Sequence, residues 1–329
     1  MTSEGLHNIL VTGGAGFIGT SLIPVLLGRG YHVTVADHLS VGKRENLASF
    51  FSHDNFDFIE FDLLDGNNKL KQAIEKCDLT FHLAGNSIVQ TGYRDSEVDF
   101  FNNIVATRNV LENMRTSDFC KKIIFTSTSA IYGEPLIIPT SEDYGPLKPI
   151  SMYGASKLAC EALICGYSGM FGIESVIFRL ANVVGPSSRH GVIFDFFRKL
   201  EQSEGKHLEI LGDGTQKKSY LYIDDCIDAL VNFGLRRFTS RTEIFNVGSD
   251  DQIDTNSIAQ IIIGELGLQT EIRYAAKQND GRGWIGDIKN MLLSTDKLKK
   301  IGWKINYSSK ESVYLTTRQI IDNNYIKEK

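Results

Sequence analysis

A glycine-rich segment near the start of the chain limits the possible fold more than any other feature. The apolar residues 9–11 precede Thr12-Gly-Gly-Ala-Gly-Phe-Ile-Gly19, and apolar residues then recur at helical spacing over 17–27. This order predicts a strand, a tight turn and a helix. Glycines in such a turn adopt backbone angles that side chains forbid, and they let a pyrophosphate approach the positive end of the helix. The segment therefore predicts a dinucleotide site.

An acidic residue after the next strand indicates which dinucleotide is bound. Asp37 ends a second predicted strand, residues 31–37, and stands eighteen residues after Gly19. A carboxylate at this place accepts hydrogen bonds from the adenosine ribose hydroxyls and repels a 2′-phosphate. We therefore predict NAD. NADP stays the alternative because Lys43 and Arg44 follow closely.

The order of the elements predicts the fold class. Strands and helices alternate through the first half of the chain, which is typical of a parallel sheet with helices on both faces. No linker rich in proline or serine divides the 329 residues. We expect an α/β protein with a Rossmann-type, doubly wound parallel sheet and a smaller C-terminal α/β lobe. Residues 1–180 and about 223–254 would form the NAD-binding domain, and about 181–222 and 255–329 the substrate lobe.

Composition excludes several classes of function. The formal net charge is −5, so no basic surface for nucleic acid or membrane is indicated. No run of 18 apolar residues and no signal-peptide pattern is present, and we expect a cytoplasmic protein. The five cysteines form no C-x-x-C pair and are expected to be reduced thiols. Neither cysteines nor histidines show ligand spacing, so no metal site is predicted.

Two residues on one predicted helix carry the chemistry. Tyr153 and Lys157 are four residues apart, so they share one face of the helix that begins near Ser151. A tyrosine is a weak base because its usual pKa is about 10. An ammonium group one turn away favours the phenolate, which can remove a proton from a substrate hydroxyl while a hydride leaves the same carbon. The pair follows a strand end rich in serine and threonine, and it predicts a catalytic base with its partner.

Over nearly its whole length the chain resembles extended short-chain dehydrogenases/reductases of the NAD-dependent nucleotide-sugar epimerase/dehydratase family. The motifs that carry the resemblance occupy residues 12–19, 37–40, 62–63, 82–85, 127–133, 153–157, 179–182, 212–216 and 222–225. The resemblance implies Thr128 as a third catalytic residue beside Tyr153 and Lys157. It also implies a homodimer in which an expected long helix over about 96–115 and the helix from Ser151 meet between protomers, with Phe100, Ile104, Leu158 and Leu163 as apolar candidates.

The residues after Thr128 indicate which reaction is catalysed. In 4,6-dehydratases of this family Asp-Glu follows the threonine, and in the decarboxylases a Glu stands two positions after it. Here these residues are Ser129 and Ala130, neither of which acts as a general acid near neutral pH. The pattern is similar to the 4-epimerases, and it implies NAD-dependent epimerisation at C4 of a UDP-hexose through a transient 4-keto sugar.

The resemblance assigns cofactor contacts to the glycine turn, the strand ends and the catalytic helix. These residues are Gly13, Gly16, Phe17, Ile18, Gly19, Asp37, His38, Leu39, Ser40, Gly42, Asp62, Leu63, Leu83, Ala84, Gly85, Ser87, Asn103, Thr126, Tyr153, Lys157 and Ala181.

The resemblance also assigns contacts to the UDP-sugar, which the second lobe would hold. These residues are Ser87, Thr128, Tyr153, Asn182, His190, Val192, Leu211, Lys218, Arg282 and Asp287. Two of the places depart from the family pattern. Lys218 stands where an arginine is usual on the diphosphate, and Trp284 occupies the place of a second arginine, three residues before Asp287. Arg282 is the expected replacement.

Several alternatives stay open from the sequence. Met291 stands where a side chain influences whether an N-acetyl group at C2 fits, and methionine is intermediate in size and flexible. UDP-glucose, UDP-galactose and UDP-N-acetylhexosamines therefore all remain candidates. UDP-glucuronate 4-epimerase, 4,6-dehydratase and 4-ketosugar reductase are the alternative enzymes. A nucleotide-sensing protein without activity is the non-enzymatic alternative.

Overall fold

The computed structural model describes residues 7–65, 68–275 and 280–323. The chain folds into two compact units. The first unit contains Met1–Thr128, Ala155–Arg179 and Ile227–Phe245, and the second contains Ser129–Gly154, Leu180–Cys226 and Asn246–Lys329. That the first unit holds NAD and the second the nucleotide sugar stays a prediction.

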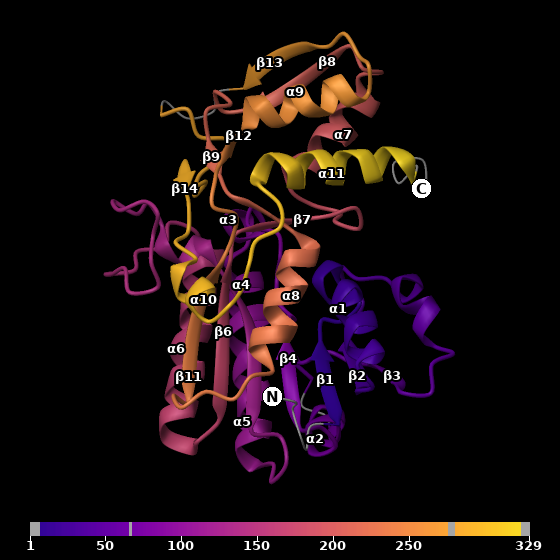
Figure 1. Ribbon diagram of the computed structural model, residues 1–329, viewed down its shortest axis with the longest axis vertical. Helices are drawn as coiled ribbons and strands as arrows, with labels where there is room; N and C mark the ends of the chain where they lie inside the picture. Colours follow the sequence, from indigo (N-terminus) through magenta and orange to yellow (C-terminus); the bar gives the residue numbers. More distant parts are fainter. Residues whose placement is uncertain (1–6, 66–67, 276–279, 324–329) are drawn as a thin grey trace. The chain divides into compact units, whose positions relative to one another are not determined.

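A seven-stranded sheet with the order β11-β6-β5-β4-β1-β2-β3 forms the centre of the first unit (Figure 1). β1 pairs in parallel with β2 and with β4, so the strand order reverses beside β1. Ligands of doubly wound sheets bind at the carboxyl ends of the strands, next to such a reversal. The strands are β1 Asn8–Thr12, β2 His32–Asp37, β3 Phe56–Glu60, β4 Leu79–His82, β5 Lys122–Thr128, β6 Glu174–Leu180 and β11 Thr242–Val247.

Helices cover both faces of this sheet, as the alternating sequence predicts. On one face α2, α5 and α6 contribute to a continuous apolar core with the strands. On the other face Gly234 of α8 packs on Ile124, and Arg29 after α1 donates to Asn232 of α8. The helices are α1 Phe17–Gly28, α2 Asn68–Glu75, α3 Thr91–Arg94, α4 Ser96–Asp99, α5 Ala106–Thr116, α6 Met152–Phe171 and α8 Ile223–Gly234.

One feature of the first unit differs from the sequence-based expectation. The long helix expected over 96–115 is interrupted by a π-helical turn, Phe100–Val105, between α4 and α5. The polar stretch after Asp37 contains a 3₁₀ helix, Arg44–Phe50. A π-helical turn places an extra residue in the helix, so apolar periodicity alone does not reveal it.

Among its described residues, the second unit has its own core and three small sheets. β8 pairs in parallel with β13, and β7 with β10. β9 lies between β12 and β14. Its strands are β7 Asn182–Val184, β8 His207–Leu211, β9 Lys217–Lys218, β10 Tyr220–Tyr222, β12 Ile253–Asp254, β13 Glu271–Ala275 and β14 Asn290–Met291.

Four helices and a 3₁₀ turn complete the second unit. Ser308 and Glu311 form a capping box at the start of α11, where each side chain accepts from the other residue's backbone N–H. Within the described ranges, none of the helices combines the length and apolar composition that a bilayer crossing requires. The helices are α7 Val192–Gln202, α9 Thr255–Glu265, α10 Asp296–Lys300 and α11 Ser309–Asp322, and the 3₁₀ turn is Ser129–Tyr132.

Candidate active site

The turn between β1 and α1 has the geometry that a pyrophosphate requires. Gly13 adopts a φ of +72°, and its N–H donates to the Ala36 carbonyl at 2.8 Å. A Cβ on Gly19 would lie 2.5 Å from the Gly14 Cα, whereas a Cβ on Gly16 would approach only the Gly13 carbonyl. Gly16 caps α1 without a side-chain acceptor, so the first N–H groups of the helix are available to an anion. The turn therefore fits a dinucleotide.

Asp37 is held against the same turn. Its Oδ2 accepts from the Ala15 N–H at 3.0 Å and its Oδ1 from the Leu39 N–H at 2.8 Å. These bonds orient the carboxylate at the end of β2 and leave lone pairs for a ribose. Arg44, which kept NADP as an alternative, pairs with Glu60 at 3.6 Å. Its guanidinium also lies 5.1 Å from the centres of the rings of Phe51 and Phe58.

The remaining predicted adenosine contacts lie at the ends of β2 and β3. Asp62 accepts from the Leu64 N–H at 2.9 Å, which forms a tight turn. Leu63 is buried, and its carbonyl accepts from Asn109 of α5. Gly42 packs against Ala15, where an added Cβ would lie 2.7 Å from the Ala15 carbonyl oxygen. His38 and Ser40 are exposed.

Lys157 is buried at the centre of the first unit. Its Nζ donates to the Thr126 carbonyl at 3.1 Å and lies 4.7 Å from the centre of the Phe125 ring. Burial lowers the pKa of Lys157. Half-buried Tyr153 precedes it by one turn on α6, and Thr128 is the last residue of β5. The structure thus places the predicted base and its lysine on one face of one helix.

The loop after β4 rests on Asn103 and Lys157. Asn103 Oδ1 accepts from the Asn86 N–H at 2.8 Å, and its Nδ2 donates to Ser156 Oγ at 2.7 Å. A Cβ on Gly85 would lie 2.6 Å from Asn103 Oδ1 and 3.4 Å from Lys157 Nζ, so only glycine fits there. Leu83 and Ala84 are half-buried on the same loop, and Ser87 is exposed.

Two buried polar groups near Lys157 were not found from the sequence. Glu161 accepts from Ser127 and pairs with Arg179 at 2.8 Å, which ties α6 to β5 and β6. His82 bridges Thr12 at 2.7 Å and Thr107 at 3.0 Å. Burial, followed by the charge of Lys157, lowers the pKa of His82 to about 3, so the ring is neutral. The position of Glu161, one turn after Lys157, is the signal that could have revealed it.

Three predicted substrate residues of the second unit come together as a cation cluster, which consists of Lys218, Arg282 and Asp287 with Glu134, Asp280 and Trp284. Lys218 Nζ lies 2.5 Å from Asp287 Oδ1 and 5.2 Å from the centre of the Trp284 ring. Arg282 pairs with Asp280 at 2.5 Å and with Glu134, and donates to the Asp287 carbonyl at 2.6 Å. Both cations are therefore already bound to acidic groups of the chain.

Four further predicted substrate residues lie on different elements of the second unit. Asn182 begins β7 and donates to the Ser219 carbonyl at 3.3 Å. His190 lies two residues before α7, and Ser188 Oγ lies 3.2 Å from its Nδ1. Val192 begins α7, Leu211 ends β8, and Ala181, assigned to the cofactor, is buried before β7.

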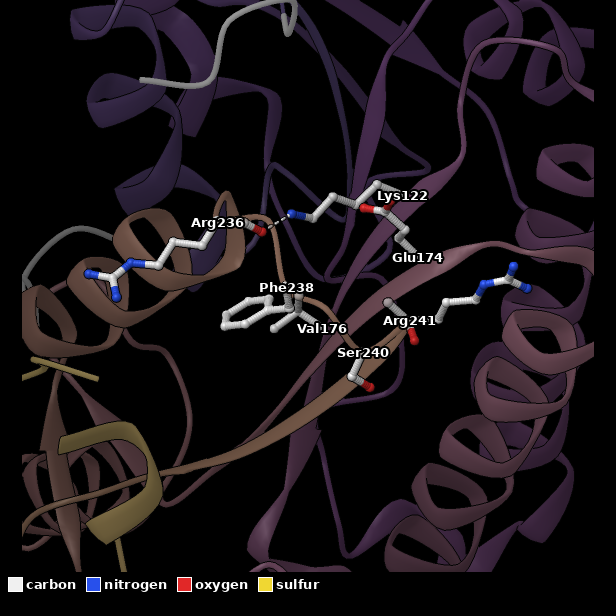
Figure 2. Close-up of a pocket in the computed structure, with 8 residues that line it drawn as sticks. Lys122, Glu174, Val176, Arg236, Phe238, Ser240 and Arg241 are labelled. Atoms are coloured by element: carbon white, nitrogen blue, oxygen red, sulfur yellow. Dashed lines mark hydrogen bonds between the residues drawn. The ribbon is translucent and has the colours of Figure 1, made fainter. Parts of the chain in front are cut away.

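A small pocket of the first unit lies at the amino-terminal ends of the sheet strands, whereas the predicted site lies at their carboxyl ends (Figure 2). Lys122 begins β5 and Thr128 ends it, so this pocket is about 20 Å from the strand end that the predicted site uses. Lys122 Nζ donates to the Arg236 carbonyl at 2.6 Å, and burial lowers the pKa of Lys122 to about 8. None of the predicted site residues lines this pocket. Its lining is Lys122, Glu174, Ser175, Val176, Arg236, Phe238, Ser240 and Arg241.

Comparisons with known proteins agree with the fold and the glycine turn. The sequence profile of the NAD dependent epimerase/dehydratase family matches residues 9–248. A putative UDP-glucose 4-epimerase of Methanocaldococcus jannaschii is 30% identical over 96% of this chain and 99% of its own. The chain belongs to the NAD-dependent epimerase/dehydratase family of extended short-chain dehydrogenases/reductases.

Solved structures give the same result. The crystal structure of a UDP-galactose 4-epimerase matches with a TM-score of 0.83 and 38% identity, over 96% of this chain and 99% of that one. The UDP-glucuronic acid 4-epimerase of Bacillus cereus, solved with UDP-glucuronic acid and NAD, matches with a TM-score of 0.86 and 30% identity over the same shares. The predictions of a Rossmann-type fold, of NAD as cofactor and of an enzyme of the isomerase class are confirmed.

Proposed function

We propose that the protein is an NAD-dependent 4-epimerase of a UDP-hexose, and that UDP-glucose and UDP-galactose are the substrate pair it interconverts. The observation that carries the proposal is the pair Tyr153 and Lys157 on α6, with the lysine buried beside the end of β5. The glycine turn and Asp37 support a bound dinucleotide on the same sheet. Relatives with 4-epimerase names match nearly the whole chain, which supports the same reaction.

The proposed chemistry uses few groups of the chain. Tyr153 removes the proton of the C4 hydroxyl, and Thr128 donates a hydrogen bond to the substrate oxygen. Lys157 favours the phenolate by its charge and holds the ribose of the cofactor. When bound, NAD supplies the hydride acceptor and donor. The 4-keto sugar turns about its diphosphate bonds, and Tyr153 returns the proton when the other face is reduced. No net oxidation occurs.

The residues after Thr128 support epimerisation against elimination. Ser129 and Ala130 begin the 3₁₀ turn that follows β5. A dehydratase needs a general acid to expel water from the sugar, and neither side chain supplies one. The same absence opposes decarboxylation. UDP-glucuronate 4-epimerisation stays the second candidate, since the solved epimerase for that substrate superimposes with a TM-score of 0.86.

The substrate panel that tests the proposal consists of UDP-galactose, UDP-glucose, UDP-N-acetylglucosamine and UDP-glucuronate. Each is incubated with the purified protein without added reductant, and products are separated by chromatography. We expect UDP-galactose and UDP-glucose to interconvert. If only another pair interconverts, the protein is a 4-epimerase of that pair instead. A stable keto product would indicate a dehydratase, and consumption of added NADH would indicate a reductase.

Two tyrosine variants give the matched control. Tyr153→Phe removes the proposed base, and we expect kcat to fall by about 10²- to 10⁴-fold with bound NAD retained. Tyr167→Phe removes a hydroxyl on the same helix that bonds to Glu112 at 2.9 Å, and we expect kcat to be unchanged. Equal losses in both variants would show that the helix, rather than the phenol, limits the rate.

The homodimer and the cytoplasmic location stay proposals. Phe100 is 48% exposed and lies in the π-helical turn. Ile104 and Leu163 pack partly against the core of the first unit, and Leu158 is half-buried. Exposed aromatic surface next to α5 and α6 supports a contact between two copies of these helices. Sedimentation at micromolar concentration would test it, with a monomer as the contradicting result.

A further inference from the structure

Asp99 is a carboxyl group enclosed in the first unit that the proposed reaction does not use. It ends α4 directly before the π-helical turn, and its side chain is fully buried. Its Oδ1 accepts from Asn86 Nδ2 at 2.9 Å and from Asn103 Nδ2 at 3.3 Å. Among the residues described by the structure, its Oδ2 has no hydrogen-bond partner. A buried carboxylate with an unpaired oxygen is costly unless a positive charge lies near.

Lys157 is the positive charge in the same interior. Its side chain is 5% exposed and makes one hydrogen bond, to the Thr126 carbonyl. The amide of Asn103 lies close to both charged groups. Its Nδ2 donates to Asp99 Oδ1, and a Cβ added to Gly85 would lie 2.6 Å from Asn103 Oδ1 and 3.4 Å from Lys157 Nζ. Asp99 and Lys157 are therefore neighbours of the same amide.

The other ionisable groups around Lys157 are neutral or already paired. Glu161 on α6 is bound by Arg179 of β6 at 2.8 Å. His82 on β4 is neutral between two threonines. Cys160 on α6 accepts from Thr107 of α5, and burial raises the pKa of its thiol. Of the two carboxyl groups whose charge favours protonated Lys157, Glu161 is already paired with Arg179, which leaves Asp99 among the described residues.

We propose that Asp99 is the buried counter-charge of Lys157, a positioning residue that keeps the lysine protonated. Burial raises the pKa of Asp99 and lowers the pKa of Lys157, and the charge of each group opposes the shift of the other. Without the negative charge, Lys157 loses its proton at lower pH. The consequence for catalysis rests on the proposed function, because a neutral Lys157 no longer favours the Tyr153 phenolate.

The first test uses the protein without substrate. Asp99→Asn keeps the size of the side chain and an acceptor oxygen but removes the charge. It is made in the natural chain and in a Lys157→Met chain, and urea unfolding is measured at pH 8. We expect Asp99→Asn to lower the urea midpoint when Lys157 is present and to raise it when Lys157 is replaced, since an unpaired buried charge is what destabilises. Equal shifts in both chains overturn the proposal.

A surface acid on the same helix gives the matched control. Glu97 of α4 is exposed, and Glu97→Gln removes one negative charge without touching the interior. We expect the same midpoint shift from Glu97→Gln in both chains. The shift caused by Glu97→Gln could instead differ between the two chains as much as the shift caused by Asp99→Asn. That result would show that the overall charge of the protein, and not the buried pair, couples to Lys157, and it would overturn the proposal.

The second test is the pH profile of kcat/KM for the interconverting UDP-sugar pair. We expect Asp99→Asn to move the alkaline limb to lower pH by about one unit or more, as removal of a close opposite charge does. Asn86→Ala breaks a hydrogen bond of Asp99 but keeps the charge, and its alkaline limb should stay in place. A shifted limb in Asn86→Ala and none in Asp99→Asn would overturn the proposal.

The two tests separate this inference from the proposed function. A midpoint that depends on Lys157, in a protein inert toward every UDP-sugar, would contradict the 4-epimerase and support the counter-charge. Equal midpoint shifts in a protein that interconverts UDP-sugars would support the 4-epimerase and contradict the counter-charge.

Discussion

The glycine turn and the cation cluster show two ways in which a predicted binding region is encoded. In the turn, the backbone forms the predicted site, and Gly13, Gly14 and Gly19 are each required by atoms close to them in the chain or in an adjacent segment. In the cation cluster, the side chains make the site, and they are held by acids from distant segments. Glu134 binds Arg282 across 148 positions, and Asp287 binds Lys218 across 69.

This difference explains what each region contributes to binding. Backbone N–H groups at a helix start keep their polarity whatever the surrounding side chains do. A lysine or arginine that already pairs with a buried acid carries less net charge toward a diphosphate. We therefore expect the dinucleotide to be held tightly, and the UDP-sugar to be held by cations whose charge is largely balanced.

Gly19→Ala should have the largest effect. The added Cβ would lie 2.5 Å from the Gly14 Cα and carbonyl oxygen, so the turn must move. We expect NAD affinity, measured by calorimetry, to fall by at least about 100-fold, the loss associated with broken charge-assisted contacts. Gly28→Ala in the same helix is the control, since nothing lies within 4 Å of its added Cβ. Unchanged NAD affinity in Gly19→Ala would contradict the account of the turn.

Asp37→Asn should weaken the choice of cofactor. The carboxylate is fixed by the Ala15 and Leu39 N–H groups, and loss of its charge removes both a strong acceptor and the repulsion of a 2′-phosphate. We expect the ratio of NAD to NADP affinity to fall by roughly 10- to 100-fold, the value of one or two hydrogen bonds to a charged group. An unaltered ratio in equilibrium titrations would show that another residue sets the preference.

Lys218→Met should change the sugar-nucleotide region less. We expect KM for the UDP-sugar to rise roughly tenfold with kcat unchanged, since one hydrogen bond to a charged group is lost. Asp287 would be left buried without its cation, which destabilises the fold. The double variant Lys218→Met with Asp287→Asn removes that cost. The double variant should have the urea midpoint of the natural protein and the raised KM of Lys218→Met. A KM that returned to the natural value would show that Lys218→Met had affected only folding.

Glu134→Gln should have the smallest effect. It removes one of the two acidic partners of Arg282, both of which are partly exposed. Such pairs contribute little, so we expect KM to fall by about fivefold or less, as Arg282 gains charge toward the diphosphate. A higher KM in steady-state kinetics would instead show that Glu134 places Arg282 correctly.

The sequence predicted the parts of the molecule that depend on local pattern. The strand, turn and helix around 8–28, the acid at Asp37 and the spacing of Tyr153 and Lys157 all follow from neighbours within one or two turns. The buried bridge from Thr12 through His82 and the pair of Asp99 with Asn86 did not follow. Their partners lie on other elements, and only the folded sheet brings them together. The role of each predicted site residue stays a prediction.

The π-helical turn shows the same limit within one helix. One long helix is expected over about 96–115, and the described segment is helical from Ser96 to Thr116 apart from this change of hydrogen bonding. The turn leaves Asn103 buried and Phe100 exposed. An extra residue in a helix changes which side chains face inward without changing composition, so the identity of the buried residues there required the structure.

Deuterium at C4 of the substrate reports whether the hydride returns to the carbon that it left. UDP-galactose that carries deuterium at C4 is incubated with the protein in ordinary water, and the C4 position of the product is examined by NMR. The account predicts UDP-glucose with deuterium still at C4, because the atom leaves the carbon and returns to it within one enclosed site that needs Tyr153 and Lys157. Product with protium at C4, or no product from any UDP-sugar of the panel, would contradict it.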